Sequence, residues 1–131
     1  MAKPQLSIAY PQLFVADVTR AAAFYVDKLG FTVAYLYGEP PFYGLVERDH
    51  AGLNLRCVER PAIDPVVRER ESLLSANIPV DDVAALFAEF QDRGVDVAQP
   101  LTRQPWGASD FIVRDPDGNL LCFASATDKQ K

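Results

Sequence analysis

The chain carries few residues of the kinds that build a metal site or a nucleophilic catalyst. Its 131 residues include one histidine, His50, which stands in the turn-like sequence Arg-Asp-His-Ala-Gly at 48–52. The cysteines Cys57 and Cys122 lie in separate apolar runs and form no Cys-x-x-Cys pair. A zinc site needs several cysteine or histidine ligands, and a Ser-His-Asp triad needs a central histidine. The residue types therefore argue against both chemistries, and no catalytic residue is assigned.

For two charged side chains, ligand binding and simple solvation are both alternatives. Arg56 is either a solvated strand residue or the anchor for an acidic ligand group, and Asp110 is either a solvated acid or the partner of a cationic group. Asp81 and Asp82 resemble a catalytic pair on paper, but Asp82 stands where a helix cap is expected. These residues become informative only once the elements that position them are known.

Composition and charge exclude several classes of protein. A chain of 131 residues with 49% hydrophobic and 24% charged residues is typical of one soluble domain that needs no disulfide or structural metal. No apolar run reaches the ~18 residues of a membrane span, and the N-terminus lacks an export pattern, so a cytoplasmic protein without a membrane partner is expected. Two cysteines without export signals are expected to be reduced.

The distribution of charge says more than its total. Residues 1–62 hold equal numbers of basic and acidic side chains, so the whole net charge of −5 belongs to residues 63–131. No basic patch is visible, which argues against nucleic acid as a partner. The acidic second half favours a cationic small molecule, although a solvated acidic face explains the same pattern.

The chain repeats itself. The residue pairs that match at an offset of 65 include Val15 with Val80, Asp17 with Asp82, Ala23 with Ala88, and Tyr25 with Phe90. An offset of 64 then matches Gly30 with Gly94. Such a repeat is too long for a solenoid, so it indicates a duplicated supersecondary unit. We expect one domain with module one at about 5–60, a connector at 61–72 and module two at about 73–126.

Each module is predicted to have the order β-α-β-β-β. A short apolar run precedes the helix-capping aspartate, and apolar residues then recur at helical spacing up to the glycine. The predicted helices therefore span the residues between Asp17 and Gly30 and between Asp82 and Gly94. The strands predicted after the glycines are 32–37, 43–47 and 53–58 in module one, and 95–98, 111–114 and 120–124 in module two. The fold class is α+β.

The paired modules resemble the vicinal oxygen chelate superfamily, which includes glyoxalases, extradiol dioxygenases, fosfomycin-modifying enzymes and bleomycin-resistance proteins. The residues that carry the resemblance are Phe24-Tyr25 and Leu29-Gly30 in the first helix and the sequence Asp-Pro-Asp-Gly-Asn at 115–119. Pro105-Trp106-Gly107 and the connector look most like the bleomycin-resistance branch. The resemblance implies a curved mixed sheet around a cleft.

The same resemblance locates the positions that hold a metal in the enzymes of the superfamily. They correspond here to Tyr10 and Ser75 near the start of the first strand of each module, Cys122 on the last strand, and Asn54 or Arg56 in module one. Divalent metals in such sites prefer carboxylate and imidazole ligands, so this set predicts no metal and no cofactor. We expect these side chains to line the cleft instead. Because side chains alternate along a strand, Gly52 and Arg56 should share a face with Asn54, and Leu120 and Ala124 should share one with Cys122.

Aromatic residues on loops complete the expected ligand site. Phe42 and Tyr43 follow Pro40-Pro41, and Trp106 lies between Pro105 and Gly107. Loops at these places reach over the cleft in the superfamily, and aromatic faces suit a flat heteroaromatic ligand, with about 0.5–2 kcal/mol per contact. Core packing is an equal alternative for Trp106. The expected ligand-binding residues are Trp106, Phe42, Tyr43, Arg56, Asn54, Tyr10, Ser75, Cys122 and Asp110.

The resulting hypothesis is a metal-independent protein of the bleomycin-resistance type that sequesters a bleomycin-like or other cationic aromatic antibiotic. The resemblance further implies a homodimer whose clefts lie at the subunit junction. One alternative is a glyoxalase-like lyase or isomerase, or a dioxygenase-related enzyme, in which the ligand positions are misregistered. The other is a small module that binds an unknown metabolite.

Overall fold

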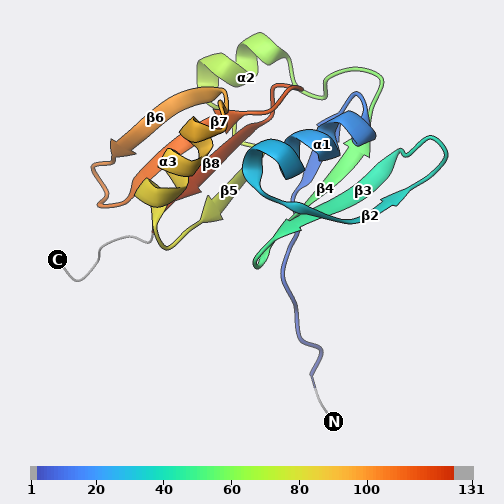
Figure 1. Ribbon diagram of the computed structural model, residues 1–131, viewed down its shortest axis with the longest axis horizontal. Helices are drawn as coiled ribbons and strands as arrows, with labels where there is room; N and C mark the ends of the chain where they lie inside the picture. The colour runs from blue at the N-terminus through green and yellow to red at the C-terminus, as the bar shows by residue number, and fades with distance from the viewer. Residues whose placement is uncertain (1–2, 126–131) are drawn as a thin grey trace.

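A computed structural model describes residues 3–125 of the chain. Module one contains β1 (Gln12–Val15), α1 (Val18–Leu29), β2 (Thr32–Tyr37), β3 (Tyr43–Arg48) and β4 (Ala51–Cys57). Module two contains β5 (Ala76–Pro79), α3 (Val83–Asp92), β6 (Val97–Arg103), β7 (Ser109–Arg114) and β8 (Leu120–Ala124). The two modules lie side by side in Figure 1, and residues 3–9 extend away from the body without regular structure. The α+β class and the repeated β-α-β-β-β order are confirmed.

Each module has its own four-stranded mixed sheet. The strand order is β1-β4-β3-β2 in sheet one and β5-β8-β7-β6 in sheet two. In both sheets the first strand of the module pairs in parallel with the last, and the other neighbours are antiparallel. The repeat seen in the sequence is therefore a repeat of topology.

The two aspartates cap their helices in the same way. The Asp17 side chain accepts a hydrogen bond from the backbone N–H of Arg20, and the Asp82 side chain accepts one from that of Ala85, both at 3.0 Å. Gly30 ends α1 with a φ of 75°, a conformation that glycine adopts without strain. These local signals are why both helices begin where the sequence predicts.

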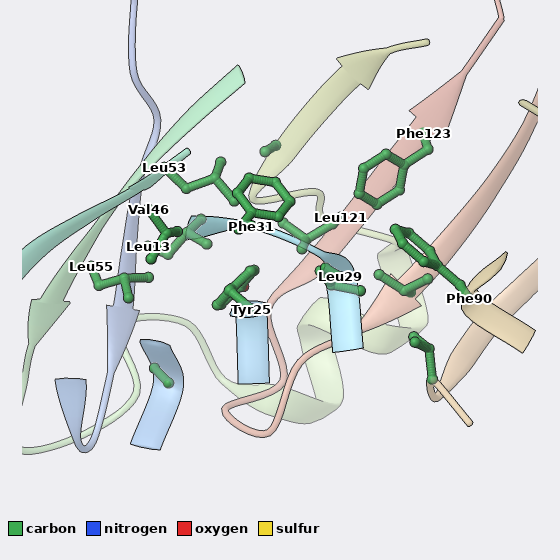
Figure 2. Close-up of a cluster of buried hydrophobic side chains, with 14 of the residues drawn as sticks. Leu13, Tyr25, Leu29, Phe31, Val46, Leu53, Leu55, Phe90, Leu121 and Phe123 are labelled. Atoms are coloured by element: carbon green, nitrogen blue, oxygen red, sulfur yellow. The ribbon is translucent and has the colours of Figure 1, made fainter. Parts of the chain in front are cut away.

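One apolar core serves both modules. Figure 2 shows Tyr25 and Leu29 of α1 between side chains of sheet one and Leu121 of β8, with Phe90 of α3 beside Phe123. All of these residues belong to a single cluster of buried side chains that draws on both sheets. Burying one large apolar side chain contributes roughly 1.5–3 kcal/mol, so this shared core joins the modules into one unit.

A network of buried hydrogen bonds also joins the modules. The Tyr25 hydroxyl donates to Asp115 Oδ2 at 2.7 Å, and Asn119 Nδ2 donates to the same oxygen at 2.9 Å. Asn119 Nδ2 also donates to the backbone carbonyl of Phe14 in β1. The Asp-Pro-Asp-Gly-Asn turn between β7 and β8 therefore fastens module two to the first strand and helix of module one.

The connector contains a helix that the sequence did not predict. This helix, α2 (Pro65–Glu71), begins after Asp64, whose side chain accepts a hydrogen bond from Val66 N–H at 2.8 Å. Arg114 of β7 donates to both carboxylate oxygens of Glu69 in α2, at 2.8 and 3.0 Å. The two prolines and the high charge of the segment masked a short capped helix. No helix within residues 3–125 is long and apolar enough to cross a membrane.

Candidate functional site

Each sheet has a face that is turned away from the shared core, here called its open face. In β4, Leu53 and Leu55 enter the core, so the alternating residues Gly52, Asn54 and Arg56 lie on the open face of sheet one. In β8, Leu121 and Phe123 enter the core. Leu120, Cys122 and Ala124 therefore lie on the open face of sheet two. The period-two expectation for these strands is correct.

Aromatic and polar side chains gather on the open face of sheet one. Tyr43 is directly opposite Arg56 across β3 and β4, and its ring lies 6.4 Å from that of Tyr35 in β2. The Arg56 side chain is exposed and makes no ion pair or hydrogen bond with residues 3–125. Asn54 is half-buried and donates weakly to the carbonyl of Gly44 at 3.4 Å. The face thus offers one free guanidinium among tyrosine rings.

Tyr10 and Phe42 border the same face. The Tyr10 ring lies directly over Gly52, where an added Cβ would come within 2.4 Å of a ring carbon. Phe42 lies in the loop between β2 and β3, half exposed, with its ring 5.5 Å from that of Tyr37. Glycine at 52 therefore makes room for Tyr10, and both rings remain accessible at the margin of the face.

The open face of sheet two is more closed and holds fixed polar groups. Asp110 and Cys122 are both buried, and Ile112 is opposite Cys122 across β7 and β8. Burial, with a smaller contribution from the nearby Asp110 carboxylate, raises the pKa of the Cys122 thiol to about 11. Cys122 is therefore a protonated, unreactive thiol at neutral pH.

Trp106 lies on the turn that connects β6 to β7. The Gly107 N–H donates to the carbonyl of Gln104 at 3.0 Å, and the Gln104 N–H donates to the carbonyl of Ala108 at 2.8 Å. The Trp106 side chain is 63% exposed, and no aromatic ring within residues 3–125 stacks on it. The exposed ring excludes core packing of Trp106 within a single chain.

Ser75 is on the same face as Cys122 but under the connector helix. Arg68 of α2 donates to Ser75 Oγ at 2.8 Å, and Ser75 Oγ donates to Asn119 Oδ1 at 3.0 Å. The Ser75 hydroxyl is therefore already hydrogen-bonded to two other side chains of the protein. Tyr10 and Asn54 belong to module one, whereas Ser75 and Cys122 belong to module two; Tyr10 and Ser75 each precede the first strand of their module.

These four side chains do not fit a divalent metal ion. Tyr10, Asn54, Ser75 and Cys122 include no carboxylate and no imidazole, and the Cys122 thiol keeps its proton at neutral pH. Within residues 3–125, no three His, Cys, Asp or Glu side chains gather in a group that could hold a metal.

The structure groups the predicted residues by module rather than into one pocket. The core lies on the helix side of both sheets, so each open face points away from the other module. A cavity of about 830 Å³ lies elsewhere, between the β3–β4 hairpin and the start of α3. Its lining includes His50 and Asp82 but none of the nine predicted residues. We place the candidate site on the open faces, because they carry the free aromatic and charged groups.

Three residues of these faces were missed by sequence reasoning. Tyr35 could have been found by the period of two along 32–37, which places it beside Tyr43. Gln99 and Gln104 each donate to Asp110 Oδ1, at 2.7 and 2.8 Å. Folding the chain into a hairpin at Pro105-Trp106-Gly107 would have brought both glutamines near Asp110.

Comparisons with known proteins agree with this architecture. The model of a family described as the glyoxalase/bleomycin resistance protein/dioxygenase superfamily matches residues 7–123. A bleomycin resistance protein of Geobacillus stearothermophilus is 30% identical over 121 residues, covering 86% of this chain and 92% of that protein. A bleomycin resistance protein of Staphylococcus aureus gives the same values.

Solved structures show the same fold. A bleomycin-binding protein from Streptomyces verticillus, crystallised with copper(II)-bleomycin, is 28% identical with a TM-score of 0.73, covering 95% of this chain and 99% of that one. A glyoxalase/bleomycin resistance protein/dioxygenase from Alicyclobacillus acidocaldarius has a TM-score of 0.74 at 21% identity, covering 95% and 94% of the two chains, and supports the fold alone. Because the family model spans nearly the whole chain and the strands follow the repeated order, the chain belongs to the glyoxalase/bleomycin resistance protein/dioxygenase superfamily.

Proposed function

We propose that this protein binds and sequesters a bleomycin-type or other cationic aromatic antibiotic, without a resident metal and without changing the ligand chemically. The observation that carries the proposal is the solvent-exposed Trp106, 63% exposed on a tight turn whose Gln104 side chain contacts the nearly buried carboxylate of Asp110. An exposed tryptophan gains from stacking on a flat ring, and a carboxylate attracts a cation. The named relatives, which are bleomycin resistance and bleomycin-binding proteins, support the same ligand class.

The proposed ligand-binding residues divide between the modules. Trp106, Asp110 and Cys122 form the part on module two, where the buried thiol is an apolar surface rather than a nucleophile. Module one contributes the following side chains: Tyr10, Phe42, Tyr43, Asn54 and Arg56. Ser75 takes part indirectly, since its hydroxyl connects Arg68 to Asn119.

We further propose a homodimer with a cleft at each subunit junction. One chain alone turns its two open faces outward, so a cleft lined by both needs a second copy. Exposed apolar side chains on module one support this pairing, because such surface costs free energy when left in water. They are Leu6, Ile8, Tyr10, Val33, Tyr35, Leu36 and Tyr37.

The protein is proposed to act in the cytoplasm. Cys57 and Cys122 are both free, and they lie in different modules. Free thiols persist in a reducing compartment, which supports this location.

Calorimetric titration with metal-free bleomycin tests the ligand. We expect binding that persists in the presence of a chelator, and Trp106→Ala should weaken it about 10-fold or more if the ring is a central contact. Val66→Ala, at an exposed position on α2, is the control and should leave affinity unchanged. Absence of heat and of a thermal shift, with bleomycin and with a panel of cationic aromatic antibiotics, would refute sequestration.

Two further measurements test the remaining parts of the proposal. Ligand recovered after long incubation should have an unchanged mass, whereas a converted product would indicate an enzyme of the superfamily. Sedimentation should give twice the 14.5 kDa mass of the chain. A monomer that binds with full affinity would contradict clefts at the subunit junction.

A further inference from the structure

Asp110 is a nearly buried carboxylate that has no basic partner among residues 3–125. The residue is only 9% exposed, and its carboxylate makes no salt bridge with any group of residues 3–125. Removing a charge from water without pairing it is costly, so buried carboxylates normally have a cation or several donors beside them. The surroundings of Asp110 are therefore incomplete unless something else supplies positive charge.

The hydrogen bonds of this carboxylate are strongly asymmetric. Oδ1 accepts from Gln99 Nε2 at 2.7 Å and from Gln104 Nε2 at 2.8 Å. Oδ2 accepts no hydrogen bond from residues 3–125, and it is not among their fully buried side-chain oxygens. One oxygen is thus held by neutral amides, and the other is free toward the open face of sheet two.

Gln104 also sets the shape of the turn that carries Trp106. Its backbone N–H donates to the carbonyl of Ala108, and its own carbonyl accepts from the N–H of Gly107. Its side chain adds the contact with Asp110, six residues further along the chain. Gln99 contacts the same carboxylate oxygen but lies within β6, outside the turn. Asp110 therefore reaches Trp106 through Gln104 and through no equivalent contact of Gln99.

We propose that Asp110 is a specificity-determining residue, which selects a positively charged ligand group at Oδ2 and, through Gln104, positions Trp106 for stacking. This inference rests on the proposed function and adds to it the oxygen atom that recognises the charge and the coupling of charge recognition to stacking. A cationic nitrogen such as an ammonium or amidinium supplies the missing counter-charge. A neutral or anionic group of the same shape leaves the carboxylate uncompensated.

Trp106 is the only tryptophan of the chain, so its fluorescence reports on the turn directly. The first experiment compares Gln104→Leu with Gln99→Leu in the free protein, by acrylamide quenching and anisotropy. Gln104→Leu should lower the anisotropy and increase the quenching of Trp106, and Gln99→Leu should leave both as in the wild type. Equal changes in the two variants, or no change in either, would overturn the positioning role.

The second experiment uses a matched pair of probes, benzamidinium and benzamide, which share a ring and differ in charge. In the wild type, benzamidinium should change Trp106 fluorescence at a concentration about 10- to 100-fold lower than benzamide, the range expected for a hydrogen bond to a charged group. Asp110→Asn should abolish this preference, and Val66→Ala, at an exposed position on α2, should keep it. Equal effects of the two probes, or a preference that survives in Asp110→Asn, would overturn the selectivity.

Controls keep this test separate from folding and from the proposed function. Circular dichroism and thermal unfolding verify each variant, and Asp110→Ser replaces Asp110→Asn if the latter does not fold. A protein that prefers benzamidinium but does not bind bleomycin would retain the inference and contradict the proposed ligand. If the Asp110→Asn variant binds bleomycin as tightly as the wild type does, the inference alone is contradicted.

Discussion

The two modules of this chain share a fold but differ in the side chains that their open faces carry and in how far those faces are covered. In module one every residue of β2 is exposed, and the face presents tyrosine rings and the free guanidinium of Arg56. In module two Ile112, Leu120 and Cys122 form a small buried cluster, and α2 lies against the same end of the sheet through Arg68 and Arg114. Duplication has thus preserved the groups needed for folding, while the surfaces available for binding have diverged.

The cores of the modules also differ at equivalent positions. Tyr25 and Phe90 match in the repeat, and both are fully buried. Tyr25 donates to Asp115, whereas Phe90 packs edge to face on Phe111 and Phe123, with centroids 5.8 and 5.3 Å away. Module one is therefore joined to its neighbour by a polar contact, and module two is held by an aromatic cluster. Substitutions at these positions test that contrast.

The largest effect is expected for Phe90→Ala. Removing this ring leaves a cavity beside Phe111 and Phe123, which should reduce the free energy of unfolding by about 3–5 kcal/mol. Urea denaturation followed by circular dichroism measures the change. A loss below about 1 kcal/mol would show that the aromatic cluster collapses to fill the space, so that module two does not depend on it.

A smaller effect is expected for Tyr25→Phe, which gives module one the residue type found in module two. Loss of the hydroxyl removes a hydrogen bond to a buried carboxylate and should cost about 1.5–3 kcal/mol near neutral pH. Phe90→Tyr is the reciprocal variant, and it buries a hydroxyl among phenylalanine rings. If Tyr25→Phe were neutral, the polar contact would not be what joins the modules.

The cost of Tyr25→Phe should also depend on pH. Burial raises the pKa of Asp115, although hydrogen bonds from Tyr25 and Asn119 act to lower it. A raised folded-state pKa means that the stabilising contribution of this carboxyl is complete below its unfolded pKa and is lost as pH rises through the folded value. Removing the hydroxyl raises the folded pKa of Asp115 further, so the cost should shrink as the pH falls through the raised folded pKa values, which lie above the ordinary value for aspartate. Urea midpoints across this range measure it.

The smallest effect tests the likeness of the modules rather than their difference. Asp17→Ala and Asp82→Ala each remove one capping hydrogen bond of 3.0 Å, so each should cost about 1 kcal/mol. The two losses should agree within about 0.5 kcal/mol and should add in the double variant, because the caps share no partner. Strong non-additivity would mean that the two helix starts are coupled.

Much of the fold was predictable because its signals are local. A capping aspartate, an apolar spacing of three and four residues and a terminal glycine act within one turn or one helix, so both helices are found from the sequence. The helix α2 was missed because a seven-residue segment with high charge has almost no apolar periodicity, and its place depends on Glu69 and Arg114. The end of β6 was missed because its pairing with β7 is irregular.

The candidate site was predictable only in part. Strand period correctly placed Asn54 with Arg56 and Cys122 with Leu120, because alternation is a property of the backbone. The environment of each side chain was not predictable, since burial depends on neighbours far along the chain. Asp110 illustrates this: as a residue type it suggests a solvated acid, but the hairpin brings the side chains of Gln99 and Gln104 onto one carboxylate oxygen and leaves the residue only 9% exposed.

The sequence by itself therefore determined the duplication, the order of strands and helices, the caps, the scarcity of metal ligands and the location of the negative charge. These properties depend on residue type and short spacing. Only the tertiary structure decided that the two open faces turn away from each other, that the connector covers Ser75, and that Asp110 has no counter-charge within the described part of the chain, residues 3–125. Those properties arise from contacts between segments far apart in the sequence, such as Glu69 with Arg114, which are 45 residues apart, and Phe14 with Asn119, which are 105 apart; no local pattern records them.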